Sequence, residues 1–246
     1  MVSTDGKARQ EVARGEVMLN ARSIAYRVVR SRRARQVRLR FLGPGTVEVV
    51  VPPRFRLPPI EEILCSKQRW IARQLDRVDA LPPIKSNRVG YLGMEYDVVV
   101  QRLPGRTVRI LMEQGHFQLA LPYGVQPAPV VESFLRRQAR TILHEQTRVW
   151  ADVMQVQYGR LSVRDQHTRW GSCSANGGLN FSWRLVMAPP PVLEYVVIHE
   201  LMHLREMNHS TRFWEGVATY CPAYRQQRAW LKENGVRLAR RLCVEG

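Results

Sequence analysis

The chain has 246 residues, enough for one or two domains with a buried core. Hydrophobic residues make up 45% and charged residues 24%, as in soluble globular proteins, and no run of 18 apolar residues predicts a membrane span. The charge is unusual, because 38 lysines and arginines face 21 aspartates and glutamates, a formal net charge of +17. Such an excess fits contact with nucleic acid or an acidic membrane surface, and it equally fits a solvated arginine-rich surface; the charge alone does not decide between them.

Residues 1–16 contain no apolar core of the kind a secretory signal needs, and we expect residues 1–20 to form a disordered lead-in. The four cysteines are widely spaced and include no C-x-x-C pair. This spacing argues against a cysteine zinc cluster and, without an export signal, predicts reduced thiols in a cytoplasmic protein. The four are Cys65, Cys173, Cys221 and Cys243.

Residues 21–125 predict a β-rich N-terminal region. Alternating or β-branched stretches indicate strands, and one helix with a spaced apolar side interrupts them at residues 60–78. The expected strands are 24–29, 37–41, 46–51, 88–92, 96–102, 107–112 and 116–121. Residues 122–129 hold three prolines and one glycine and mark the expected domain boundary. No internal repeat is recognisable in the sequence.

Residues 128–240 predict a second, mainly helical region, so the chain as a whole is expected to be α+β. A long helix over 130–158 is followed by strands at 161–164 and 178–185 around the loop 168–174. Further helices are expected at residues 190–206, from residue 211 and at residues 222–232, with Ser210 as an N-cap and Gly235 just beyond the last helix.

The stretch His199-Glu200-Leu201-Met202-His203 carries the clearest chemistry. Its two histidines are four residues apart, so on a helix they lie on one face and can both bind one zinc ion. Glu200 lies between them and is placed to take a proton from a metal-bound water. The pattern HExxH can arise by chance, but a chance copy would rarely lie on a helix with an apolar stripe such as that of Leu193, Val197, Leu201 and Leu204.

His209 is a plausible third ligand if the helix ends before it. On a continuous helix it would point about 120° away from His203. Asn208 makes a break plausible, because asparagine tolerates the left-handed conformation that often ends helices.

Several motifs together resemble the YgjP-like metallopeptidases, bacterial relatives of the SprT and WLM families. The resemblance is densest over residues 160–235, and a weaker similarity covers residues 32–41, 67–71 and 91–96. Its motifs are residues 168–174 (TRWGSCS), 180–185 (NFSWRL), 188–189, 195–204 (YVVIHELMHL), 208–210 and 213–214. Glu194 stands where the family usually has aspartate, and Phe181-Ser182 varies an asparagine-rich strand.

The resemblance implies a zincin-like domain in which His199, His203 and His209 bind one zinc ion and Glu200 is the general base. The expected activity is hydrolysis of peptide bonds in a protein or peptide substrate. A second donor to the oxyanion is also expected, and Arg169, Tyr195 and Tyr224 are the candidates. Trp170 and Trp183 could line a substrate groove, but packing around the metal helix is the alternative.

Three other functions stay open. A nucleic-acid-associated protease, as in the SprT and WLM relatives, would fit the positive charge, although no dedicated binding motif is present. A zinc-dependent nucleotide phosphohydrolase would use the same metal beside many arginines. A structural zinc site would need a fourth protein ligand, for which His167 is the nearby histidine.

Overall fold

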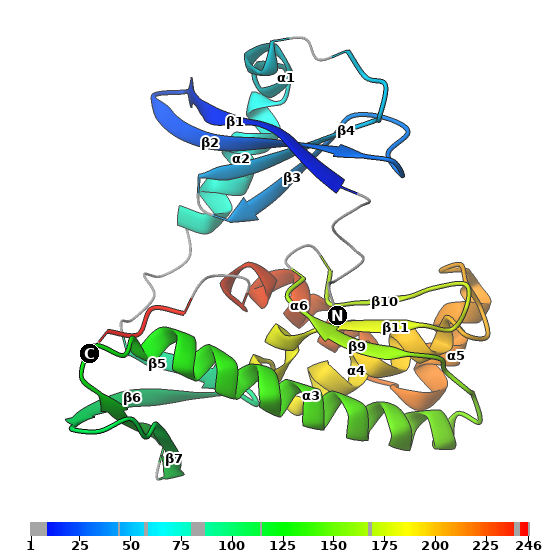
Figure 1. Ribbon diagram of the computed structural model, residues 1–246. Coiled ribbons are helices and arrows are strands. Elements are labelled where there is room, and N and C mark those ends of the chain that lie inside the picture. Colours follow the sequence, from blue (N-terminus) through cyan, green and yellow to red (C-terminus); the bar gives the residue numbers. More distant parts are fainter. Residues whose placement is uncertain are drawn as a thin grey trace. The chain divides into compact units, whose positions relative to one another are not determined.

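A computed structural model describes residues 9–43, 45–56, 59–79, 87–113, 115–166, 169–238 and 242–245 (Figure 1). It divides into two compact units, residues 1–82 and residues 83–246. The division falls well before the proline-rich residues 122–129 that we expected to separate the domains. Those residues instead connect a strand to a helix inside the second unit. No helix in the described ranges has the length and apolar character needed to cross a membrane.

The first unit is a four-stranded sheet followed by two helices. Its strands have the order β1-β2-β4-β3, with β2 and β4 parallel and the outer pairs antiparallel. Both helices contribute to one core with the strands, built around Ile24, Val49, Leu64 and Ile71. The elements are β1 (Arg9–Leu19), β2 (Arg22–Ser31), β3 (Arg38–Gly43), β4 (Thr46–Val51), α1 (Ile60–Ser66) and α2 (Gln68–Asp79).

Two expectations for this unit were wrong. The lead-in is not disordered over residues 9–19, because these residues form β1 and pair along β2; residues 1–8 lie outside the described residues. The helix expected over residues 60–78 is two helices separated at Lys67. The Ser66 hydroxyl donates to the Ile63 carbonyl, and this kind of bond competes with the helical ladder.

The second unit begins with another four-stranded sheet and a long helix. The strand order is β5-β6-β8-β7, and the long helix packs its apolar side on this sheet through residues such as Phe134 and Leu135. The elements are β5 (Arg88–Tyr91), β6 (Met94–Leu103), β7 (Arg109–Glu113), β8 (His116–Pro122) and α3 (Pro127–Val153). The helix stops five residues earlier than expected, since Gln155 adopts a left-handed backbone with φ of 50°.

The rest of the second unit is a small three-stranded sheet and three helices that carry the HExxH stretch. The elements are β9 (Leu161–Arg164), β10 (Gly171–Cys173), β11 (Leu179–Ser182), the 3-10 helix η2 (Trp183–Met187), α4 (Pro190–Met202), α5 (Thr211–Tyr220) and α6 (Tyr224–Leu238). The N-cap at Ser210 is confirmed, because its hydroxyl accepts a hydrogen bond from the Phe213 N–H. All four cysteines have free thiols.

Helix α6 runs past the end that the sequence suggested. Gly235 lies inside it, and a Cβ there would be 3.2 Å from the indole of Trp170. The glycine therefore serves close packing against Trp170 and does not end the helix. The expected apolar stripe on α4 was also too narrow, because residues from Val192 to Met202 are buried on nearly every side.

Candidate metal centre

Helix α4 places the first two histidines of the site. Pro190 and Pro191 occupy its first turn, where proline fits because the N–H groups have no partner within the helix. His199 lies in the last turn, and His203 caps the helix with a backbone that is still α-helical, so the spacing of one turn is kept. Their ring centroids are 5.0 Å apart.

The chain then turns back to bring His209 to the same place. The N–H groups of Arg205 and Glu206 bond to the carbonyl of Met202, which ends the helix before His209. Nε2 of His209 lies 3.1 Å from Nε2 of His199. One ligand atom from each of the three histidines lies within 4.8 Å of the others. Two imidazole nitrogens on one tetrahedral zinc ion would be about 3.3 Å apart, so this spacing fits a shared ion.

The surroundings of His199 and His203 favour the neutral imidazole that can bind a cation. Burial, together with the smaller effects of the neighbouring His203 and His209, lowers the pKa of His199 to about 3. Burial also lowers the pKa of His203, whose Nδ1 lies 3.1 Å from the Glu206 carbonyl. A proton held on that Nδ1 leaves Nε2 with a lone pair for a metal. Nδ1 of His199 is buried without a hydrogen-bond partner among the described residues, which is unusual for a polar atom.

Glu200 points from the same helix into the small sheet. The carboxylate accepts a hydrogen bond from the N–H of Cys173 in β10, and Glu200 is only 5% exposed. Burial raises the pKa of Glu200 to about 7, while Arg169 and the Cys173 hydrogen bond act in the opposite direction. A Cβ at Gly171 would lie 2.5 Å from Cγ and Oε1 of Glu200. Glycine at this position is therefore what allows β10 to approach the carboxylate.

Aromatic side chains of α5 and α6 enclose the histidines. The ring of Phe213 is fully buried, and its centroid lies 5.0, 4.6 and 4.8 Å from those of His199, His203 and His209. Trp214 stacks on His209 at 5.5 Å and on Tyr224 at 5.3 Å.

The guanidinium of Arg228 lies 4.9 Å from the centroid of the Trp214 ring. Trp214 is thus held by contacts with both Tyr224 and Arg228. His209 comes from a loop, and the stack gives it a fixed neighbour.

A family model described as "YgjP-like, metallopeptidase domain" matches residues 35–234. The chain belongs to the YgjP-like metallopeptidase family. This match spans both units and confirms the resemblance found in the motifs. Membership implies a metal ion, and the three histidines form a group that could hold one.

Two solved structures also match, both of zymogens. The metallopeptidase zymogen abylysin of Pyrococcus abyssi shares 18% identity over 37% of this chain and 93% of its own, with a TM-score of 0.34. The zymogen jannalysin of Methanocaldococcus jannaschii shares 15% over 36% of this chain and 94% of its own, with a TM-score of 0.32. No curated protein matches the chain.

The three candidates for a second donor in this YgjP-like chain have different surroundings. Arg169 is exposed, lies two residues before β10, and its positive charge lowers the pKa of Glu200. Tyr195 lies one helical turn before His199 with ring centroids 5.8 Å apart, and burial raises its pKa to about 12, so it stays a neutral phenol. Tyr224 is engaged in the stack on Trp214. Arg169 is therefore the most accessible of the three. His167 and Thr168 lie outside the described residues.

Sequence reasoning missed a polar cluster around Asp165 in the second unit. Asp165 accepts hydrogen bonds from Trp183 Nε1 at 3.0 Å and from Nε of Arg184 at 3.2 Å. It also pairs with Arg136 of α3 at 2.9 Å, and Arg184 is only 3% exposed. Trp183, which is only 1% exposed, is thus a packing residue, and Trp170 packs against Gly235 of α6. A lone aspartate after a strand gave no signal in the sequence that could have revealed this role.

Proposed function

We propose that this YgjP-like chain is a zinc-dependent peptidase with a zincin-like active-site helix. His199, His203 and His209 would hold one zinc ion, and Glu200 would be the general base. The observation that carries the proposal is the convergence of three imidazoles beside a buried carboxylate. Three imidazoles favour zinc over harder cations and leave a coordination position open, as in catalytic zinc sites.

The chain's own residues account for the proton transfers. A bound zinc ion would supply Lewis acidity, lowering the pKa of water and polarising a carbonyl. Glu200 would take the proton of the attacking water on a carboxylate oxygen and pass it to the departing amine nitrogen. The N–H of Cys173 fixes the orientation of that carboxylate, and Arg169 would contribute positive charge near the developing oxyanion.

The test combines metal analysis with cleavage of a quenched fluorescent peptide library. Protein purified without added metal should contain about one zinc per chain, and His209→Ala should lose most of it. Glu200→Gln should keep the zinc and lose about 10²- to 10⁴-fold in cleavage rate, the usual contribution of a general base. A zinc-loaded chain whose Glu200→Gln variant cleaves as fast as the parent would refute the proposal.

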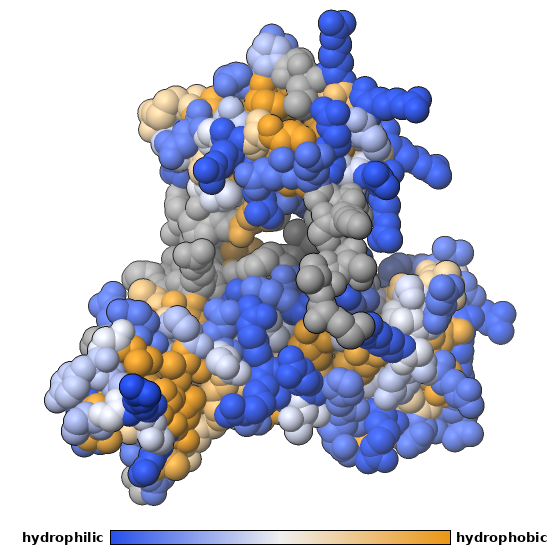
Figure 2. Space-filling view, in the orientation of Figure 1, coloured by the Kyte–Doolittle hydropathy of each residue, from blue (hydrophilic) through white to orange (hydrophobic). Residues whose placement is uncertain are grey.

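A nucleic-acid-associated protease is the second candidate, and the charge of the first unit favours it. Residues 1–82 hold 17 lysines and arginines against 8 aspartates and glutamates, whereas residues 83–246 hold 21 against 13. Arg14, Arg27 and Arg40 lie in one cross-strand row with Glu48, which pairs with the last two. Figure 2 shows hydrophilic side chains projecting from this unit. Cleavage stimulated by DNA and suppressed by salt would support this candidate.

The other candidates have less support. Across the described ranges, the His/Cys/Asp/Glu group that could hold a metal consists of the three histidines alone, without the carboxylates typical of phosphate-processing metal sites. Release of phosphate from nucleotides that is abolished in Glu200→Gln would support the phosphohydrolase hypothesis. A fourth protein ligand would favour a structural site.

Four free thiols suit a reducing compartment such as the cytoplasm.

A further inference from the structure

The two units share a topology that the sequence conceals. Each begins with a four-stranded sheet in which an antiparallel hairpin, a parallel central pair and a second antiparallel hairpin follow in the same order. Helices follow the fourth strand in both units. The two sheets thus repeat one topology, although no repeat is recognisable in the sequence. Corresponding positions in the two sheets can be compared directly.

The first hairpin of each sheet closes with the same kind of turn. In both, two residues with positive φ join the strands: Asn20 and Ala21 at 50° and 61°, and Leu92 and Gly93 at 49° and 81°. Such two-residue turns match the twist of the strands, and the N–H groups of the two turn residues point away from the hairpin ladder.

In the second unit, this turn binds a segment of its own chain. The N–H of Leu92 donates to the carbonyl of Val186 at 2.7 Å, and the N–H of Gly93 donates to that of Met187 at 3.3 Å. A Cβ on Gly93 would lie 2.9 Å from Cα of Pro189, so the glycine lets the segment approach closely. The same segment packs against α3 and buries its aliphatic side chains. The turn and helix together form a receptor for residues 186–189.

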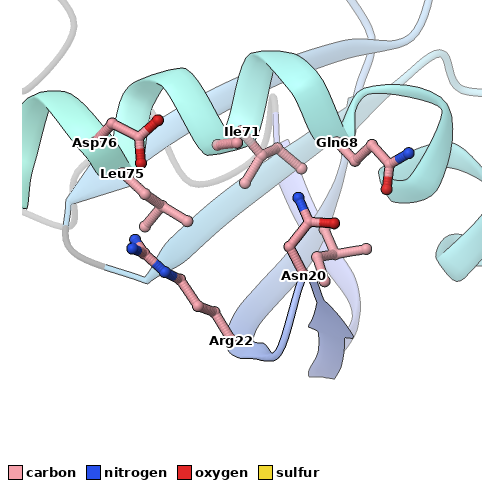
Figure 3. Close-up of a pocket in the computed structure, with 8 residues that line it drawn as sticks. Asn20, Arg22, Gln68, Ile71, Leu75 and Asp76 are labelled. Carbon is pink, nitrogen blue, oxygen red and sulfur yellow. The ribbon is translucent and has the colours of Figure 1, made fainter.

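In the first unit, the corresponding place between the turn and α2 is a pocket (Figure 3). Its apolar lining is Leu19, Ile71, Ala72 and Leu75. Its polar lining is Asn20, Arg22, Gln68 and Asp76. A second hollow shares Asn20, Gln68 and Ala72 and continues past Arg69 and Arg73, so the two form one groove along α2.

We propose that this groove docks an extended acidic segment of a protein partner, as the second unit docks residues 186–189. The N–H groups of Asn20 and Ala21 would bind carbonyls of the segment, in the place of Leu92 and Gly93. The apolar lining would take an aliphatic side chain. Three arginines against one aspartate around the groove select a segment with acidic residues beside the aliphatic one. This docking does not depend on the chemistry of the histidine site.

The test is fluorescence polarisation with the full chain and a labelled peptide. The probe carries the sequence of residues 185–190, Leu-Val-Met-Ala-Pro-Pro, between two pairs of glutamates. Saturable binding is expected, and Ala72→Arg should weaken it about 10-fold or more by filling the groove. Gln74→Arg adds the same side chain to the same helix outside the groove and should change binding less than about 2-fold.

Two further variants check the chemistry of the interaction. Arg73→Glu changes an exposed side chain and should weaken binding of the acidic peptide but not of a version with lysines for glutamates. Ala21→Gly removes the Cβ that Gly93 lacks and should strengthen binding. No saturable binding up to about 1 mM, or binding indifferent to Ala72→Arg, would overturn the proposal. Displacement of the peptide by duplex DNA, with the same sensitivity to Ala72→Arg, would assign the groove to nucleic acid instead.

Discussion

The position of Glu200 depends on Gly171, which has no functional side chain. Because a Cβ at Gly171 would lie 2.5 Å from the Glu200 side chain, Gly171→Ala must move either the carboxylate or β10. We expect peptide cleavage to fall about 10²-fold or more, toward the loss of a general base, while zinc content stays near one per chain. Zinc analysis and cleavage assays on the same sample measure both.

Gly90→Ala is the matched control for this prediction. Gly90 also lies on a strand of the second unit, but a Cβ there would meet Met187 only at 3.6 Å, an ordinary contact. Its activity should stay close to that of the parent. If Gly171→Ala were equally active, the close approach of β10 would have no part in placing Glu200.

His209 depends on stacking with Trp214, since it comes from a loop and not from α4. Trp214→Ala should lower zinc affinity about 10- to 100-fold, the range found when residues that orient metal ligands are removed. Trp214→Phe should recover part of the loss, because an aromatic face remains. Competition with a zinc chelator measures the affinity. Trp230→Ala, on α6, is the control and should bind zinc like the parent.

At the scale of elements, Asp165 connects β9, α3 and η2 through one carboxylate. Asp165→Asn would leave the buried guanidinium of Arg184 without its full counter-charge. Removing one partner of a fully buried pair costs about 3–5 kcal/mol, but Asp165 is partly exposed, so we expect about 1–3 kcal/mol. Urea unfolding measures the loss. Glu145→Gln breaks an exposed pair with Arg148 and should change stability little.

The helices and strands also show how much of the fold can be predicted from the sequence. Strands with regular alternation, such as residues 116–121, were predicted close to their observed bounds. Strand β1 was missed because four charged residues and Gly15 interrupt its apolar pattern, and β10 was missed because three residues give no period. The domain boundary was misplaced since prolines in a short strand-to-helix connection resemble those of a linker.

The same contrast holds for the site. Spacing on a single helix predicted that His199 and His203 share a face. The expected end of that helix predicted that His209 could join them as a third ligand. The family motifs include Gly171 and Phe213, but they do not reveal the tertiary contacts through which these two residues and Asp165 act. Local periodicity therefore finds ligands that share an element, whereas the residues that position them appear only once the elements pack.

At the scale of the molecule, the two units have separate hydrophobic cores. We therefore expect two calorimetric transitions. Zinc should raise only the transition of residues 83–246, because all three histidines lie there. At a free zinc concentration about 100 times Kd, the stabilisation should be about 2.7 kcal/mol. His209→Ala should largely remove this effect.

Leu64→Ala identifies the other transition. Leu64 is fully buried in the first core, so its truncation should cost about 2–5 kcal/mol and lower only the transition that zinc leaves unchanged. If zinc and Leu64→Ala instead moved a single common transition, the two units would unfold as one cooperative body. Binding at the histidine site would then stabilise the groove along α2 as well. If the transitions are separate, a partner docked on the first unit does not stabilise the metal centre. It can then affect cleavage only by holding a substrate at a high local concentration.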